Sequence, residues 1–239
     1  MKEQLIVTLT TWEARIGNIP AVLDSIYKQT LKPDLVVLNL AYDLVVPADV
    51  QAYLDDHGVE VNRMPDWKVY KKLIPTLKKH PGACVVSIDD DWLYPEGMLE
   101  EFMRIHEQYP SNPISGNRVY AHETYFHCGC ASLTKSEFFG KYLDCVDKDM
   151  MRRCQSDDTV YTFLQKLNGY TYVQTENLFY ENMVPFNPSE PFSTPTSRTP
   201  VYSWRYLCDR FGHPEWDDTA PEWRKRMRRF LKLFGIFVR

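Results

Sequence analysis

Short apolar runs separated by longer amphipathic segments set the pattern of this 239-residue chain. The runs at 5–9, 35–40 and 84–88 are rich in Val, Ile and Leu, which is typical of strands buried on both faces of a parallel sheet. Between them, 19–27 carries apolar residues at helical spacing, and 59–61 predicts a further short strand. This alternation of strand and helix predicts an α/β domain with a mostly parallel sheet and right-handed crossovers.

The rest of the chain adds helices and strands in a less regular order. Apolar positions recur at helical spacing in 98–105 and 160–167, and 170–173 predicts the last strand of the sheet. The segment 67–77 also has helical spacing, although a proline interrupts its middle. The proline-rich stretch 179–200 predicts a loop that either closes over a ligand or wanders over the surface.

Composition supports one globular domain. The chain is 44% hydrophobic and 25% charged, which suits a folded α/β protein and excludes a disordered or fibrous one. We expect one domain over 1–200 and a helical tail over 201–239. The net charge of −4 argues against a nucleic-acid partner for the chain as a whole.

Cysteine usage and hydropathy favour a cytoplasmic setting. The six cysteines form no Cys-x-x-Cys pair, and Cys84 lies inside an apolar run, so we expect no disulfide framework. The first apolar run is too short for a signal peptide, and no stretch of ~18 apolar residues is present to span a bilayer. These features lead us to expect a cytoplasmic protein.

The end of the chain inverts the overall charge. In 221–239, large apolar residues recur along one side of a predicted helix, and arginines and lysines make up most of the rest. This pattern is typical of a helix that lies on an anionic membrane surface. A helix docked on the core with solvated arginines is the alternative. The apolar residues are Trp223, Met227, Phe230, Leu231 and Phe234, and the basic ones are Arg224, Lys225, Arg228, Arg229 and Lys232.

Three consecutive carboxylates, Asp89, Asp90 and Asp91, directly follow the predicted strand 84–88. In a parallel sheet, ligands bind outside the carboxyl ends of the strands. Adjacent acids repel one another there, and a divalent cation such as Mg²⁺ or Mn²⁺, held together with a substrate's phosphates, would compensate their charge. In the alternative interpretation, Asp91 caps a helix that continues through 95–102.

A second acidic pair, Asp157 and Asp158, precedes the apolar positions of 160–167, and an Asn-Gly pair ends that run. Both carboxylates therefore fall in the first turn of a predicted helix. One of them, or Ser156, is expected to cap that helix, which is the ordinary explanation for such residues.

The acidic triplet at a strand end resembles the DxD motif of nucleotide-sugar glycosyltransferases with the GT-A fold, and the order of elements over 5–175 is similar to the bacterial family 2 type. This resemblance implies that Asp89 approaches the donor ribose and shares a metal with Asp91, while Asp90 supports them. It also implies that Asp158 is the general base and Asp157 its neighbour, or the reverse, because 157–173 is similar to the "ED" segment of inverting members. The implied cofactors are Mn²⁺ or Mg²⁺ and a nucleotide-sugar donor, with UDP as the expected nucleotide.

Further donor-site candidates lie around the first two predicted strands. The resemblance implies that the loop after the first strand contacts the nucleotide, which makes Thr8, Thr10 and Arg15 candidates. Asp43 follows the second strand, where an acid can hold a uridine or ribose group, and Lys72, or the lysine before it, could neutralise diphosphate charge. A solvated arginine, a turn-forming aspartate and a solvated lysine are the ordinary alternatives.

The resemblance to GT-A enzymes also includes the segment between the two acidic sites. In GT-A enzymes it borders the donor sugar and the acceptor, so the resemblance makes His127, Gly129 and Ser132 neighbours of the site, with a tight β-bulge as the alternative. The run Thr-Thr-Trp-Glu-Ala-Arg at 10–15 looks like a subgroup associated with surface polysaccharides.

Together these features predict a metal-dependent glycosyltransferase that moves a sugar from a nucleotide-diphosphate donor to a hydroxyl of a glycan or lipid-linked acceptor, with inversion. The Gln-x-x-Arg-Trp sequence of processive synthases is absent, which favours transfer of a single sugar. A retaining GT-A transferase and a non-catalytic nucleotide-sugar or glycan-binding module are the alternatives.

Overall fold

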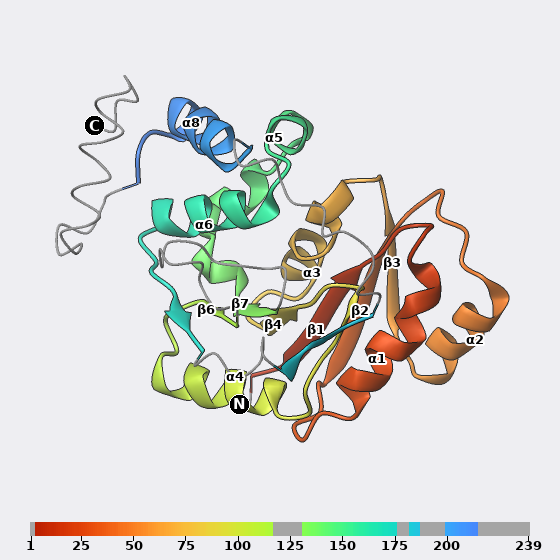
Figure 1. Ribbon diagram of the computed structural model, residues 1–239. Coiled ribbons are helices and arrows are strands. Elements are labelled where there is room, and N and C mark those ends of the chain that lie inside the picture. Colours follow the sequence, from red (N-terminus) through yellow and green to blue (C-terminus); the bar gives the residue numbers. More distant parts are fainter. Residues whose placement is uncertain (1–2, 117–130, 176–181, 187–198, 215–239) are drawn as a thin grey trace.

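The computed structural model describes residues 3–116, 131–175, 182–186 and 199–214 (Figure 1). Within these ranges a seven-stranded sheet forms the centre of the molecule. Its first four strands are parallel, whereas β7 runs antiparallel to both of its neighbours, β4 and β6. The order across the sheet is β3 (Glu60–Met64), β2 (Leu35–Ala41), β1 (Leu5–Thr10), β4 (Cys84–Ser87), β7 (Ser132–Thr134), β6 (Ile114–Ser115) and β8 (Val173–Gln174).

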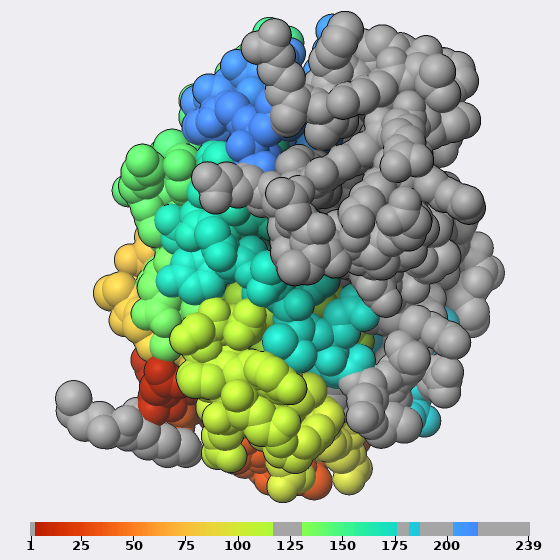
Figure 2. All heavy atoms as spheres, turned by 90° about the vertical axis from the view of Figure 1, so that its left-hand side faces the viewer, coloured from red at the N-terminus to blue at the C-terminus, as the bar shows by residue number. Residues whose placement is uncertain are grey.

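Helices cover both faces of the sheet (Figure 1). One face packs against α1 (Ile19–Tyr27), α2 (Ala48–Asp56) and α4 (Met98–Gln108). The other packs against α3 (Ile74–Lys79), α5 (Lys148–Arg153), α6 (Asp157–Leu167) and α8 (Thr199–Phe211). In the side view of Figure 2, α8, α6 and α4 follow one another from the top of the molecule to the bottom. The predicted α/β architecture with a mostly parallel sheet is thus confirmed.

Successive side chains of a strand point to opposite faces of the sheet, so each strand contributes residues to both hydrophobic cores. In β1, Val7 and Leu9 pack into the core beneath α1 and α4, whereas Ile6 faces α3 and α6. Toward the carboxyl ends, the second face changes from apolar to polar, with Thr8 and Asn39 fully buried. Buried polar side chains of this kind are stable only when they are hydrogen-bonded, so they mark a place where the sheet supports something other than a core.

The predicted strands and helices of the first half are present, with one change in the segment 67–77. That segment is not a single helix: a short 3-10 helix, η2 (Lys68–Lys71), precedes α3, and Pro75 lies in the first turn of α3. A proline is tolerated there because the first N–H groups of a helix have no intrahelical partner. The remaining 3-10 helices are η1 (Ile16–Asn18), η3 (Ser136–Phe138) and η4 (Gly140–Cys145).

The predicted domain boundary at residue 200 falls within α8. Leu207 of this helix is fully buried in the same core as α6, so the described start of the tail packs on the domain. The basic amphipathic segment 221–239, and with it the predicted membrane-surface helix, lies outside the described residues. Among the helices that the structure describes, none has the length and apolar character that crossing a bilayer requires.

Candidate active site

The acidic triplet lies at the carboxyl edge of the parallel strands, immediately after β4. A short strand, β5 (Trp92–Leu93), follows it and pairs with β9 (Val184–Pro185) from the predicted loop, and the Phe186 N–H donates to the Asp91 carbonyl at 2.7 Å. The N-cap of α4 is Gly97, six residues beyond Asp91 in the sequence. Asp91 therefore caps no helix, and the alternative interpretation of the triplet as a helix start is wrong.

The middle acid is held on both of its oxygens. Thr11 Oγ1 donates to Asp90 Oδ2 at 2.7 Å, and Arg15 lies 3.1 Å from Asp90 Oδ1 through one guanidinium nitrogen. The same nitrogen is 2.7 Å from Asp91 Oδ2. Burial raises the pKa of Asp90, against the lowering effect of Thr11 and Arg15. Asp90 is therefore an anchor for the loop after β1 and for the arginine in it.

The first acid shares a buried lysine with the second acidic site. Lys72 Nζ is 2.8 Å from Asp89 Oδ1 and 3.5 Å from Asp157 Oδ2. Tyr94 fixes the Asp89 backbone, because the Asp89 N–H donates to its hydroxyl at 2.7 Å. Desolvation by burial raises the pKa of Asp89 to about 7, although Lys72 opposes the shift. One ammonium group thus links two carboxylates that lie far apart in the sequence.

Buried polar residues of the sheet hold this lysine in place. Thr8 Oγ1 donates to the Lys72 carbonyl at 2.7 Å and lies 2.7 Å from Thr76 Oγ1. Asn39 Nδ2 donates to both threonine hydroxyls at 3.0 Å. Because Thr8 is fully buried and its hydroxyl is occupied, it lies beneath the site and supports Lys72, rather than facing a donor as the resemblance implied. Thr10, which is partly exposed, donates to the Asn39 carbonyl at 2.7 Å.

The second acidic pair occupies the first turn of α6, as predicted. Ser156 is the N-cap, and its side chain accepts the Thr159 N–H at 3.3 Å, so neither aspartate is needed as a cap. Asp157 is buried and faces Lys72, whereas Asp158 is partly exposed. Burial raises the pKa of Asp157, and Asp158 raises it further, against the effect of Lys72.

The charges and donor atoms of the site fit a divalent cation. Counted over the residues that the structure describes, four carboxylates, those of Asp89, Asp90, Asp91 and Asp157, pair with two cationic side chains, Arg15 and Lys72, so negative charge exceeds positive among these pairs. The two outer acids of the triplet keep about a quarter of their side-chain surface exposed, 29% for Asp89 and 25% for Asp91, whereas Asp90 keeps 9%. Exposed carboxylate oxygens at the first and third positions are the ligands that Mg²⁺ and Mn²⁺ prefer.

Other predicted residues are placed away from these contacts or outside the description. Asp43 is exposed in the turn after β2. Asp66 is the main cause of the raised pKa of Lys68, and the charge of Asp43 adds to it. Lys71 is buried and pairs with Asp66, so it is not solvated as the ordinary alternative held. Ser132 is buried on β7 with its hydroxyl 2.9 Å from that of Ser87. His127 and Gly129 lie outside the described residues.

Sequence reasoning missed three contributors to the site. Thr11 holds Asp90, Tyr94 holds the backbone of Asp89, and the segment ending at Phe186 joins the backbone of Asp91. The first two are near the recognised motifs in sequence, so their proximity was a usable signal. The third pairs across more than ninety residues, and no local pattern announces such a pairing.

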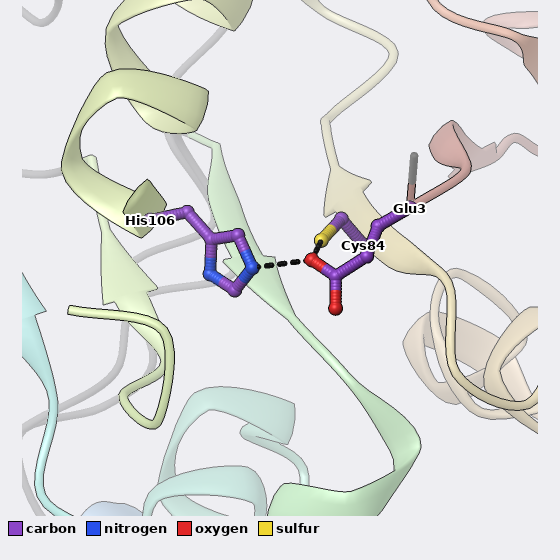
Figure 3. A group of neighbouring side chains, drawn as sticks. All are labelled: Glu3, Cys84 and His106. Atoms are coloured by element: carbon purple, nitrogen blue, oxygen red, sulfur yellow. Dashed lines mark hydrogen bonds and ion pairs between the residues drawn. The ribbon is translucent and has the colours of Figure 1, made fainter. Parts of the chain in front are cut away.

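A second polar cluster lies at the opposite end of β4, where Glu3, Cys84 and His106 converge (Figure 3). Glu3 accepts hydrogen bonds from His106 Nε2 at 2.7 Å, from Cys84 Sγ at 3.3 Å and from Lys135 Nζ at 2.7 Å. The hydrogen bond from Lys135 is the largest of the effects that lower the pKa of Glu3 to about 2, and burial raises that of the Cys84 thiol to about 12.

Carboxylate, thiol and imidazole are zinc ligands, but this arrangement does not fit a metal. Burial and the Glu3 charge raise the pKa of the Cys84 thiol, and Lys135 already supplies Glu3 with a cation at 2.7 Å. A ligating histidine also needs a partner for its second ring nitrogen, and within the described ranges the buried Nδ1 of His106 has none. Protons and Lys135 therefore satisfy the Glu3 carboxylate at this end of β4.

Comparisons with known proteins agree with the fold, but the matches come from structures and not from sequences. No protein-family model matches the chain, and no curated protein sequence matches it. Among solved structures, a mannosyltransferase from Pyrobaculum calidifontis in complex with GDP-Man and Mn²⁺ is similar, with a TM-score of 0.58 and 17% identity over 74% of this chain and 56% of that one.

Two further structures extend the similarity. TarS from S. aureus has a TM-score of 0.60 and 12% identity, over 100% of this chain and 44% of that one. Glucosyl-3-phosphoglycerate synthase from Mycobacterium tuberculosis, in complex with Mn²⁺, UDP and glucosyl-3-phosphoglycerate, has a TM-score of 0.52 and 12% identity, over 89% and 81%. This chain spans about half the length of the first two structures. Their shared architecture and the sheet described above show that this chain has the GT-A fold of nucleotide-sugar glycosyltransferases.

Proposed function

We propose that this chain is a metal-dependent, non-processive glycosyltransferase that moves a sugar from a nucleotide-diphosphate donor to an acceptor hydroxyl. The observation that carries the proposal is the shared contact of Lys72 with Asp89 and Asp157. This contact joins the carboxylates at the end of β4 to those at the start of α6, in a fold whose solved examples include complexes with UDP or GDP-Man. A purely structural use of either pair would not require the two pairs to converge.

The donor half of the site consists of the outer acids of the triplet. Asp89 and Asp91 would hold Mn²⁺ or Mg²⁺, and the bound ion would neutralise the charge that develops on the departing diphosphate. Asp90 keeps the loop after β1 against the metal-binding acids through Thr11 and Arg15. UDP is the nucleotide that we propose, and GDP is the competitor to test beside it, since the similar structures include complexes with UDP and with GDP-Man.

The acceptor half of the site consists of the first turn of α6. Asp157 is buried against Lys72, which leaves the partly exposed Asp158 as the carboxylate that an acceptor hydroxyl can approach. Asp158 takes the proton of that hydroxyl as it attacks the anomeric carbon in line, and inversion follows. Asp157 positions the first turn of α6. Its charge makes the electrostatic potential beside Asp158 more negative, which favours proton uptake by Asp158.

The acceptor that we propose is a glycan or lipid-linked hydroxyl in surface polysaccharide synthesis. The basic amphipathic sequence 221–239 supports this class, because attachment to an anionic membrane surface would bring the site to a lipid-linked acceptor. Pelleting with anionic liposomes tests it: loss of pelleting on removal of 223–239 supports attachment, and unchanged pelleting contradicts it.

Calorimetric titration of UDP and of GDP, each with and without Mn²⁺, tests the proposed function at its donor site. We expect binding of one nucleotide to depend on Mn²⁺ and to be lost in Asp91→Asn. The matched control is Asp56→Asn, which removes an exposed carboxylate at the end of α2. Binding of neither nucleotide under any condition would contradict the proposal, and nucleotide binding without transfer to any acceptor would favour a binding module.

A further inference from the structure

The inference concerns Arg15, and it rests on the proposed function. The guanidinium group bridges Asp90 and Asp91 through a single nitrogen, at 3.1 Å and 2.7 Å. It therefore stands against one of the two acids assigned to the metal. Its position raises the question of what happens to this ion pair when a divalent cation arrives.

Arginine and the metal compete for the same carboxylate. A Mg²⁺ or Mn²⁺ ion lies about 2.1 Å from a carboxylate ligand, so an ion on Asp91 would sit within about 5 Å of the Arg15 nitrogen. Two cations at that separation, in a partly buried site, repel each other strongly. Arg15 must then give up its contact with Asp91 or weaken the hold of Asp91 on the ion.

Of the two cations in the site, Arg15 is the one placed to move. Lys72 keeps 6% of its side-chain surface exposed, and Thr8 and Asn39 fix its backbone from below. Arg15 keeps 22%, projects from the loop between β1 and α1, and reaches the triplet only through the end of its side chain. A planar guanidinium group also pairs with two phosphate oxygens as readily as with carboxylates.

We propose that Arg15 is the resident counter-ion of Asp91 and exchanges its carboxylate partner for the donor diphosphate when metal and nucleotide bind together. Metal alone then binds weakly, because it separates Arg15 from Asp91 without supplying an anion in exchange. With the nucleotide present, the guanidinium group keeps its contact with Asp90 and gains a diphosphate oxygen in place of Asp91. Arg15 thereby couples the two binding events. The positive and negative charges of the site are balanced only when both ligands are present.

This exchange predicts effects of opposite sign from one substitution. In Arg15→Gln, Mn²⁺ alone binds more tightly, by about three- to tenfold, because the competing cation is gone. The nucleotide in the presence of Mn²⁺ binds more weakly, by tenfold or more, because a charged contact to the diphosphate is lost. The factor by which nucleotide raises Mn²⁺ affinity falls in consequence, and by linkage the factor by which Mn²⁺ raises nucleotide affinity falls equally.

The experiment measures free Mn²⁺ by electron paramagnetic resonance during titration of the full chain, with and without the nucleotide that wild type binds. Wild type, Arg15→Gln and Arg15→Lys are compared, with circular dichroism to check folding. The control is Arg104→Gln, which removes an arginine paired with Glu101 on α4. Arg15→Lys keeps the charge and should keep most of the competition with Mn²⁺.

The outcomes separate this inference from the proposed function. Tighter Mn²⁺ binding together with reduced coupling in Arg15→Gln, and unchanged values in Arg104→Gln, are the expected result. Weaker Mn²⁺ binding, or unchanged coupling, in Arg15→Gln overturns the exchange while leaving the donor site intact. Absence of any Mn²⁺-dependent nucleotide binding by wild type overturns the proposed function itself.

Discussion

The two ends of β4 carry polar clusters that differ in one respect, the balance of charge and protons. At the amino end, Glu3 is the acceptor for Lys135, His106 and the Cys84 thiol. At the carboxyl end, the ion pairs of the described residues join two cations to four carboxylates. Within the described part of the chain, the first cluster contains its own donors, whereas the second has more negative than positive charge.

This difference helps to distinguish a structural polar cluster from a ligand site when the solved structures with the same fold share little sequence identity with the chain. Among the described residues, only the amino end brings three possible metal ligands within 4.8 Å of one another, so closeness of ligand atoms alone does not identify the carboxyl end as the ligand site. The pKa shifts have opposite signs: the carboxyl pKa of Glu3 falls to about 2, whereas that of Asp89 rises to about 7. A carboxylate that is stabilised by its neighbours needs no further cation, and one that is destabilised by burial gains from binding one.

The largest expected effect comes from neutralising the third acid of the triplet. Asp91→Asn removes the carboxylate that we propose as a metal ligand at the departing diphosphate, so we expect turnover to fall by more than about 10³-fold, with the fold retained. Transfer assays with excess Mn²⁺ measure it. Glu3→Gln is the matched substitution at the other end of β4 and should leave turnover within twofold; a comparable loss there would erase the distinction between the two clusters.

The proposed base gives the next largest effect and distinguishes the two acids of α6. Asp158→Asn should lower kcat by at least about 100-fold with nucleotide and Mn²⁺ affinity unchanged within twofold. Asp157→Asn should lower it less, because that carboxylate acts through Lys72 and its neighbour. If the order of the two losses is reversed, Asp157 is the base. The anomeric configuration of the product, read by proton NMR, decides between inversion and retention.

Removal of the shared lysine should act on stability as well as on binding. Lys72→Met leaves the buried Asp157 and the partly exposed Asp89 without this cation, and we expect the free energy of unfolding to fall by about 3 kcal/mol. Urea unfolding measures the loss, and added Mn²⁺ should restore more stability to the variant than to wild type. Lys78→Met, which breaks an exposed pair with Asp144, is the control and should cost less than about 1 kcal/mol. Equal losses in both variants would contradict a special role for Lys72.

The smallest expected effect is the stability that Glu3 contributes through Lys135, His106 and Cys84. Its folded pKa of about 2 lies below the ordinary value of 4.5, so the contribution is complete above pH 4.5 and is lost as the pH falls toward 2. Glu3→Gln should therefore be less stable than wild type at pH 7, by on the order of 2 kcal/mol, and the difference should shrink at pH 3. Urea unfolding at both pH values checks it, and a difference that grows on acidification would contradict the assignment.

Much of the fold could be predicted from the sequence because its strands carry a strong local signal. The runs that became β1, β2 and β4 are mostly apolar and contain several β-branched residues, and the helices α1, α4 and α6 carry apolar residues at helical spacing. Helix α2 was missed, since of its nine residues only Val50 and Leu54 are buried, too few for a clear period. Pairing of β5 with β9 depends on two residues from each strand and on tertiary contacts, which no short window contains.

The site divides in the same way. The triplet and the α6 pair could be singled out because adjacent like charges in the sequence are conspicuous, and their positions after β4 and at the start of α6 follow from local pattern. The residues that support the site from below were harder to assign. The sequence predicts Thr8 in the donor site, whereas in the structure Thr8 lies under Lys72. Which hydroxyl faces a ligand and which faces a neighbouring backbone depends on the packing of η2 and α3 on the sheet.

The most direct test of the contrast between the two ends of β4 is the paramagnetic broadening of backbone amide signals by Mn²⁺ in the full chain. We predict that signals of the triplet and of Arg15 broaden first and most strongly, and more so with nucleotide present, while those of Cys84, His106 and Glu3 broaden last and least. Broadening that begins around Cys84 and His106, with the triplet unaffected, would contradict the account.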